Sequence, residues 1–127
     1  MKVVLVRHAE AAPGAPDDLR TLTPTGHEQA RQLGERLRAE GLTPNAVLTS
    51  PLLRARETGA ALGFGEPEPV DTLAPGATAD DVRAAVAGRG ETVVVVGHQP
   101  DCSRITAELR AGAEPPFPPA GVQIVDL

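Results

Sequence analysis

The sequence has few of the residue types on which disulfide-bonded, zinc-binding and nucleic-acid-binding domains depend. Its 127 residues include one cysteine, which excludes an internal disulfide and a zinc cluster built from cysteines. There is no tryptophan or tyrosine, and there are two phenylalanines, so the aromatic platforms on which bases and sugars stack are missing. The core is therefore expected to consist of Val, Leu, Ala and Ile.

Positive charge and long apolar runs are also scarce. The formal net charge is -5 and lysine occurs only at Lys2, so we expect no nucleic-acid-binding surface. No apolar stretch approaches the roughly 20 residues that cross a bilayer, and the first residues have a strand pattern rather than that of a secretion signal. We expect a cytoplasmic protein that binds neither nucleic acid nor membrane, with one domain over residues 1–127.

Two strongly apolar segments each run into a histidine. Residues 2–6 (KVVLV) precede Arg7 and His8, and residues 92–96 (TVVVV) are followed, after one glycine, by His98. Such β-branched runs are typical of strands that are buried on both faces of a parallel sheet. Because open α/β sheets bind ligands at the C-terminal edge of their strands, we expect both imidazoles at one crevice.

The rest of the chain alternates between helix and strand patterns. Thr23, Ser50 and Thr78 are expected to cap the first three helices. The predicted helices cover about 24–40, 51–62, 79–87 and 101–110, and the further predicted strands cover 46–49, 69–73 and 122–126. This order predicts a three-layer α/β/α fold with a mostly parallel central sheet.

Four motifs stand at the predicted strand ends and helix starts. They are RHAE at 7–10, LTPTG at 22–26, SPLLRARET at 50–58 and VGHQP at 96–100. In this order they resemble the motifs of the histidine phosphatase superfamily, also called phosphoglycerate mutase-like, over nearly the whole chain. Within it, the short length, the loop at 18–22 and the segment 73–75 are most similar to the SixA-type phosphohistidine phosphatases.

The resemblance implies a phosphatase that carries the phosphoryl group on an enzyme histidine and needs no metal or other cofactor. It assigns the nucleophilic attack to His8, and the binding of the phosphoryl oxygens to Arg7, Arg54 and His98. Arg54 is expected in the first turn of a helix, where backbone N–H groups add to an anion site. Arg20, in the loop before the first helix, is a further candidate for binding the substrate.

Two features depart from the family pattern. Ala9 stands where the family has glycine, which is compatible with the fold if the φ angle of Ala9 is negative. The acid that protonates alcohol leaving groups in the wider superfamily has no counterpart in the segment 73–77, and Asp71, Asp80 and Asp81 match no motif position.

The other polar residues near the motifs are expected to be structural. Glu10 is a candidate accessory residue that would orient His8 or its loop, or it is a solvated carboxylate. Asp101 and Cys102 are expected at the rim, at the start of a helix. Solvent-facing positions on helices are expected for His27, Glu28, Arg56 and Glu57.

The missing acid favours a phosphoramidate substrate over a phosphate ester. Cleavage of an ester expels an alkoxide, which needs a proton donor, whereas phosphohistidine expels an imidazole that is readily protonated. A chain of this length also leaves no room for a long lid, and an open site admits a protein surface. We expect a protein phosphohistidine phosphatase whose partner is a phosphorylated protein. The alternative within the fold is a phosphomonoesterase for a small phosphorylated metabolite.

Hypotheses from other functional classes stay open. His8, Glu10, His98 and Asp101 are of the types that ligate metals in metallohydrolases, although the neighbouring arginines would repel a divalent cation. A cysteine phosphatase is disfavoured, because Glu108 stands where its Cys-x5-Arg loop needs the arginine. A non-catalytic module that binds phosphoproteins would keep the arginines and could dispense with His8.

Overall fold

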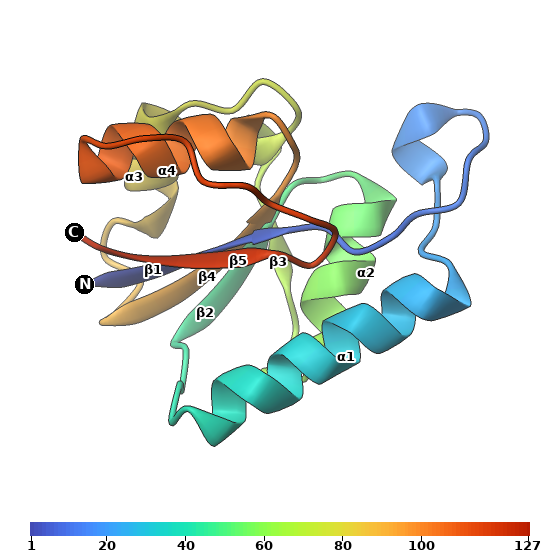
Figure 1. Cartoon of the computed structure of the whole chain (residues 1–127), viewed down its shortest axis with the longest axis horizontal. Coiled ribbons are helices and arrows are strands. Elements are labelled where there is room, and N and C mark those ends of the chain that lie inside the picture. Colours follow the sequence, from blue (N-terminus) through green and yellow to red (C-terminus); the bar gives the residue numbers. More distant parts are fainter.

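The computed structural model describes residues 1–127 as a five-stranded sheet between two layers of helices (Figure 1). The strands are β1 (Lys2–Arg7), β2 (Ala46–Thr49), β3 (Glu68–Pro69), β4 (Thr92–Gly97) and β5 (Val122–Asp126). The α-helices are α1 (Pro24–Ala39), α2 (Leu53–Ala61), α3 (Ala79–Val86) and α4 (Asp101–Arg110). The strand order is β3-β2-β4-β1-β5, and only the pair β1 and β5 is antiparallel. The predicted α/β fold with a mostly parallel sheet is confirmed.

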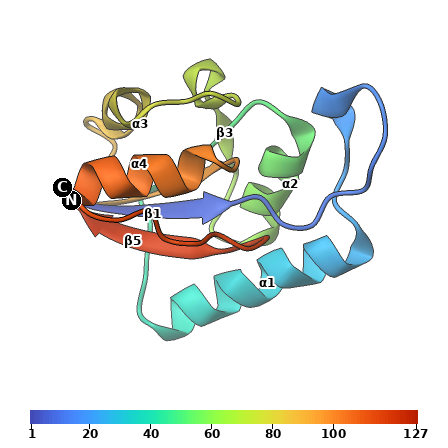
Figure 2. The ribbon, with the colours of Figure 1, turned by 45° about the horizontal axis from the view of Figure 1, so that its top comes forward.

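The sheet lies between α1 and α2 on one side and α3 and α4 on the other (Figure 2), and the alternation of side chains along β1 and β4 divides the core into two halves. Successive strand residues point to opposite faces of a sheet, and here both faces are covered. Val3, Leu5, Val93 and Val95 pack with α3 and α4, whereas Val4, Val6, Val94 and Val96 pack with α1 and α2. Both faces being apolar explains why these two strands have continuous Val and Leu runs without polar residues between them.

Two of the three predicted helix caps are confirmed. The Thr23 side chain accepts a hydrogen bond from the Gly26 N–H at 2.9 Å and so caps α1. Thr78 and Asp81 form a reciprocal capping box at α3. These bonds satisfy N–H groups that the first turn of a helix leaves without partners. None of the helices has the length and apolar character needed to span a membrane.

Two predicted boundaries were wrong. Ser50 does not cap α2, because this helix begins at Leu53 with Leu52 as its N-cap residue. The strand predicted at 69–73 is limited to β3, which ends at Pro69, and residues 71–73 form a 3₁₀ helix. That turn buries Leu73 among the side chains of α3 and α4, which an extended chain at the edge of the sheet would not do.

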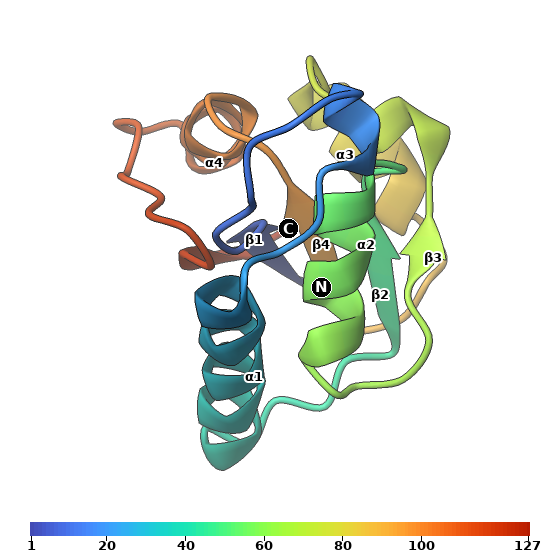
Figure 3. The same cartoon turned by 90° about the vertical axis from the view of Figure 1, so that its right-hand side faces the viewer.

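The C-terminal ends of β1, β2 and β4 meet at one edge of the sheet, which faces the viewer in Figure 3. Arg7 lies opposite Gly97 in the β1 and β4 pair, and Thr49 lies opposite Val96 in the β2 and β4 pair. The residues that follow these strands therefore emerge side by side, and the chain after β1 forms a loop in front of this edge.

The close packing of α1 on the end of α2 depends on Gly34. A Cβ atom there would lie 2.0 Å from the Leu62 carbonyl oxygen. We expect Gly34→Ala to lower the free energy of unfolding by about 2 kcal/mol or more, because moving the two backbones apart outweighs the gain of about 1 kcal/mol in helix propensity. Denaturant titration measures the effect.

The control for this prediction is Arg36→Ala, on the exposed side of the same helix. It should change the free energy of unfolding by less than about 0.5 kcal/mol. A Gly34→Ala protein as stable as the parent would contradict the prediction, because it would show that a methyl group fits between α1 and the end of α2.

Candidate active site

The structure brings His8 and His98 together at the C-terminal edge of the sheet. Their ring centroids are 5.3 Å apart and their planes are inclined by 59°. His8 follows β1 and His98 follows β4, and these two strands are paired in parallel. The topology of the sheet therefore joins two residues that are distant in the sequence.

The backbone fixes how His8 presents its ring. Its Nδ1 lies 2.8 Å from the Ala9 carbonyl oxygen, and because a carbonyl can only accept, Nδ1 carries the hydrogen and Nε2 the lone pair. Burial lowers the pKa of His8 below its usual 6.5, and the charges of Arg54 and Arg7 lower it further against the opposing effect of the Ala9 bond. At neutral pH His8 is an uncharged imidazole with Nε2 able to attack.

Ala9 is accommodated where a glycine was expected. It does not adopt a positive φ, so its methyl group introduces no backbone strain. The residue is fully buried, and its N–H donates to Thr58 Oγ1 on α2 at 3.0 Å. This bond ties the backbone next to His8 to the helix that carries Arg54.

Both arginines of the site are held by backbone carbonyl groups. Arg7 Nη1 donates to the Phe117 carbonyl oxygen at 3.0 Å, and Arg54 Nη1 donates to the Asp17 carbonyl oxygen at 2.8 Å. Arg54 is the second residue of α2 and only 6% exposed. Its position near the start of α2 adds the favourable effect of the helix dipole on an anion bound there.

His98 is held by a side chain from the neighbouring strand end. Its Nε2 lies 2.7 Å from Ser50 Oγ, and the ring is buried. Burial lowers the pKa of His98 to about 4, and the positive charge that His8 gains in acid and the charge of Arg54 act in the same direction. His98 is therefore also uncharged at neutral pH.

Three nitrogen atoms of this cluster are buried without a hydrogen-bond partner. They are Arg7 Nε, Arg54 Nε and His98 Nδ1. An unsatisfied buried donor is unfavourable, and native structures satisfy nearly all such groups. Arg7, Arg54 and His98 are each anchored through another nitrogen, while these three atoms have no partner within the protein.

The loop after β1 contributes Asp17 and Arg20. The Asp17 carboxylate contacts Arg54 Nη2 through Oδ2 at 3.2 Å and Arg20 Nη1 through Oδ1 at 3.1 Å. Arg20 Nε also donates to the Ala12 carbonyl oxygen at 2.8 Å, and the Arg20 charge helps to lower the pKa of His8. Arg20 thus lies at the side of the site, while Asp17 was missed by sequence reasoning.

Two glutamates near the motifs support this loop. Glu10 Oε1 accepts from the Thr23 hydroxyl at 2.9 Å, so Glu10 stabilises its loop rather than His8. Glu57 was expected to face solvent, which was wrong in part. Its Oε1 accepts from the Thr21 hydroxyl at 2.7 Å and from the Leu22 backbone N–H at 2.9 Å. His27 and Glu28 on α1 are exposed as predicted, whereas Arg56 on α2 is half-buried and its Nε donates to the Pro51 carbonyl oxygen at 3.0 Å.

The residues after His98 are not at the rim, contrary to expectation. Asp101 is 5% exposed, and it accepts from the Gly76 N–H at 2.7 Å and from Arg104 Nη2 at 2.6 Å. Burial raises the pKa of the Cys102 thiol to about 12, so it is not a thiolate nucleophile at neutral pH. No group of three or more His, Cys, Asp or Glu side chains is arranged to hold a metal ion.

The remaining aspartates considered as acids lie outside the cluster. Asp71 is exposed on its 3₁₀ helix. Asp80 pairs with Arg83 at 3.0 Å, and Asp81 belongs to the capping box of α3.

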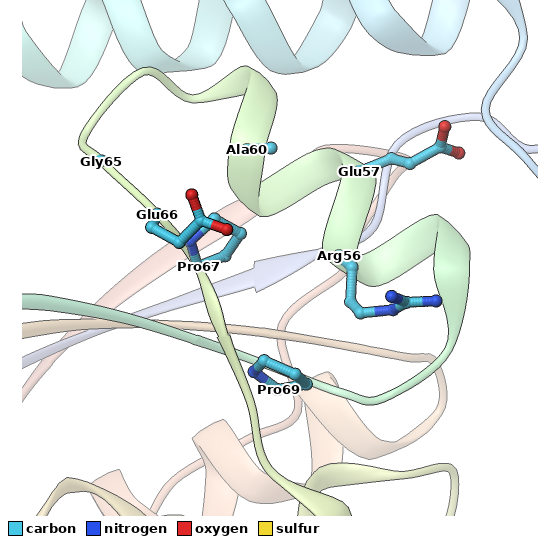
Figure 4. A pocket seen from close by; sticks show the side chains of 7 residues that line it. All are labelled: Arg56, Glu57, Ala60, Gly65, Glu66, Pro67 and Pro69. Atoms are coloured by element: carbon cyan, nitrogen blue, oxygen red, sulfur yellow. The ribbon is translucent and has the colours of Figure 1, made fainter.

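A hollow of about 550 Å³ lies along α2, apart from the histidines (Figure 4). Arg56, Glu57 and Ala60 line it from the helix, and residues of the segment 65–69 line its other side. None of the three unpartnered nitrogens belongs to its lining residues. Its lining sets one cation, Arg56, beside two carboxylates, Glu57 and Glu66, which is unfavourable for an oxyanion.

The chain is similar to histidine phosphatases in sequence and in fold. Residues 3–74 match the model of the histidine phosphatase superfamily (branch 1). The phosphohistidine phosphatase SixA of Escherichia coli (strain K12) is 31% identical over 127 residues, which cover 92% of this chain and 79% of that protein. An uncharacterized protein of Picosynechococcus is 37% identical over 112 residues, covering 80% of this chain and 68% of that protein. The solved structure of the protein histidine phosphatase SixA complexed with tungstate covers 100% of this chain and 88% of its own, with a TM-score of 0.90 and 28% identity.

Burial of His98 links folding to pH. Its pKa is about 4 in the folded protein and usually 6.5, so between these values the unfolded chain binds a proton that the folded protein does not. This contribution to stability is fully present above pH 6.5 and is lost as the pH falls toward 4, by about 3 kcal/mol at most. The free energy of unfolding, measured against pH in phosphate-free buffer, should fall less steeply in His98→Asn.

The exposed histidine provides the control. His27→Asn should keep the pH dependence of the parent, because His27 lies on the exposed face of α1. Equal slopes for the parent and His98→Asn would contradict the prediction.

Proposed function

The chain belongs to the histidine phosphatase superfamily, and we propose that it is a phosphohistidine phosphatase that moves a phosphoryl group from a phosphorylated protein to His8 and then to water. The observation that carries the proposal is the set of buried unpartnered nitrogens on Arg7, Arg54 and His98 beside an uncharged His8. Further support comes from the SixA relative, and from the similar structure solved with tungstate, a tetrahedral oxyanion shaped like phosphate.

The proposed first step is the attack of His8 Nε2 on phosphorus. The new N–P bond forms as the bond from phosphorus to the leaving imidazole nitrogen breaks. The electron pair of that bond goes to the leaving ring, which carries a proton from solvent on its other nitrogen and so departs as a neutral imidazole. The His8 ring gains positive charge in this step, and its Nδ1–H bond to the Ala9 carbonyl oxygen stabilises that charge. In the second step water attacks phosphorus, which releases phosphate and restores the neutral His8.

Arg7, Arg54 and His98 are proposed to bind the oxygens of the phosphoryl group in flight. The transition state spreads negative charge over three equatorial oxygens, and preorganised donors stabilise it more than they stabilise the substrate. The anchoring bonds to Phe117, Asp17 and Ser50 hold these side chains in place before substrate arrives.

The carboxylates around the site are poor proton donors. A hydrogen bond from Arg20, with the charge of Arg54, lowers the pKa of Asp17, so this group is ionised at neutral pH. Asp101 is occupied by Gly76 and Arg104. A site without a strong acid favours a leaving group that needs little assistance, and the imidazole of phosphohistidine is such a group.

The phosphoenzyme is the direct test of the nucleophile. After brief reaction with a radiolabelled phosphohistidine protein and a quench in base, the parent should carry label that is stable to base and released by acid. His8→Ala should carry none, and His27→Ala should be labelled like the parent. Equal labelling of His8→Ala would exclude His8 as the nucleophile. The reaction is run with a chelator present, and abolition of labelling by the chelator would favour a metallohydrolase.

The substrate class is tested by the dependence of rate on the leaving group. Without an acid, kcat/KM should fall steeply as leaving-group pKa rises, so phosphohistidine and p-nitrophenyl phosphate should react and alkyl phosphates should be slow. A working acid would contribute about 10²- to 10⁴-fold and flatten this dependence. A shallow slope in the parent that becomes steep in Asp17→Asn or Asp101→Asn would identify that acid, and would shift the substrate toward a small phosphate ester.

A further inference from the structure

Ser50 is a fully buried hydroxyl at the centre of the site. It directly follows β2, and its backbone N–H donates to the Val96 carbonyl oxygen of β4 at 2.9 Å. Its Oγ accepts from the Leu52 N–H at 3.2 Å and lies 2.7 Å from His98 Nε2. These contacts fix both the backbone and the side chain of Ser50 against the imidazole.

The position of each hydrogen around Ser50 follows from counting donors and acceptors. A hydroxyl has one hydrogen to donate, and water does not reach this side chain because Ser50 is 0% exposed. Apart from the Leu52 N–H, the hydrogen-bond partner of Oγ is His98 Nε2. If Nε2 donated to Oγ, the hydroxyl hydrogen would be buried without an acceptor, which is unfavourable. If the hydroxyl donates to Nε2, its hydrogen has an acceptor and the one group left without a partner is His98 Nδ1–H, whereas the opposite arrangement leaves both the hydroxyl hydrogen and the Nδ1 lone pair unsatisfied.

The second arrangement also determines the other nitrogen of the ring. A neutral imidazole that accepts at Nε2 carries its hydrogen at Nδ1, and the Nδ1 of His98 is the atom that is buried without a partner. With the opposite tautomer, Nδ1 would present a lone pair and repel a phosphoryl oxygen. Burial and nearby positive charge keep the ring uncharged at neutral pH, so only one of its two nitrogens carries a hydrogen. The tautomer decides which nitrogen that is.

We propose that Ser50 is a positioning residue that sets the tautomer of His98, so that the Nδ1–H of His98 is available to donate to the phosphoryl group. Contacts of opposite kinds then set the tautomers of the two histidines. The Ala9 carbonyl accepts from His8 and leaves Nε2 as the nucleophile, whereas the Ser50 hydroxyl donates to His98 and leaves Nδ1 as a donor. The catalytic half of this proposal rests on the proposed function, while the tautomer is a property of the ligand-free protein.

The tautomer is measured by two-bond proton–nitrogen correlation spectra of protein with ¹⁵N-labelled histidine, at neutral pH and without ligand. The parent should show His98 protonated at Nδ1, and Ser50→Ala should show His98 shifted toward the Nε2-protonated form. Ser50→Thr, which keeps a hydroxyl, should retain the parent pattern. The matched control is Thr49→Val, which removes the adjacent buried hydroxyl that donates to the Ser50 carbonyl oxygen at 2.9 Å and should leave the tautomer unchanged.

Binding of tungstate, measured by calorimetry, connects the tautomer to the site. Ser50→Ala should weaken tungstate binding about tenfold or more, as expected for losing a hydrogen bond to a charged group. Ser50→Thr and Thr49→Val should bind tungstate with affinities within about threefold of the parent, a smaller change than the loss of one such hydrogen bond causes. Weakened binding with an unchanged His98 spectrum would show a merely structural role for Ser50.

An Nε2-protonated His98 in the parent, or an unchanged Nδ1-protonated ring in Ser50→Ala, would overturn the proposal. Neither spectrum depends on turnover. A protein that shows the expected tautomers but does not dephosphorylate phosphohistidine would contradict the proposed function and leave the tautomer assignment in place.

Discussion

The parallel pairing of β1 with β4 is the contact on which the site depends. It places Arg7 opposite Gly97, so that His8 and His98 leave the sheet at the same level. A slip of one residue would bring Lys2 or Arg7 into the buried stretch that residues 3–6 occupy between the helices, which is unfavourable. The packing that stabilises the fold thereby sets the distance between the two imidazoles, and no local feature of either motif could do so alone.

The positive charges of the site act on the histidines as well as on an anion. Burial is the largest cause of the lowered pKa of both histidines, and Arg54 and Arg7 lower that of His8 further while Arg54 contributes to lowering that of His98. The arginines proposed to hold a phosphoryl group therefore add to the effect of burial that keeps the nucleophile deprotonated near neutral pH. Asp17, in contact with Arg54, balances part of this charge from the loop side. Nucleophilicity and anion binding thus arise from one arrangement of charges.

The sequence predicts those parts of the structure that depend on local pattern. Continuous Val runs predicted β1 and β4, and Thr23 before a proline predicted the start of α1, because burial and capping act within a few residues. Ser50 before a proline has the same local pattern, yet its hydroxyl contacts His98, a partner that only tertiary structure supplies. The carbonyl oxygens of Phe117 and Asp17 that hold the arginines have no side-chain signature and could not be predicted. An aspartate three residues before Arg20 was the available signal for the ion pair of the loop.

The distribution of unsatisfied groups separates this cluster from the rest of the protein. Asp101 and Thr58 are buried too, and each has hydrogen-bond partners within the chain. The buried side-chain nitrogens and oxygens without partners are the three on Arg7, Arg54 and His98. Each such group costs stability of about 1 to 3 kcal/mol, so a fold that satisfies its other buried side chains and leaves these three together is less stable than it could be. In the proposed function, an oxyanion bound there would remove that cost, since it supplies acceptors to the two Nε–H groups and, with the proposed tautomer, to the Nδ1–H of His98.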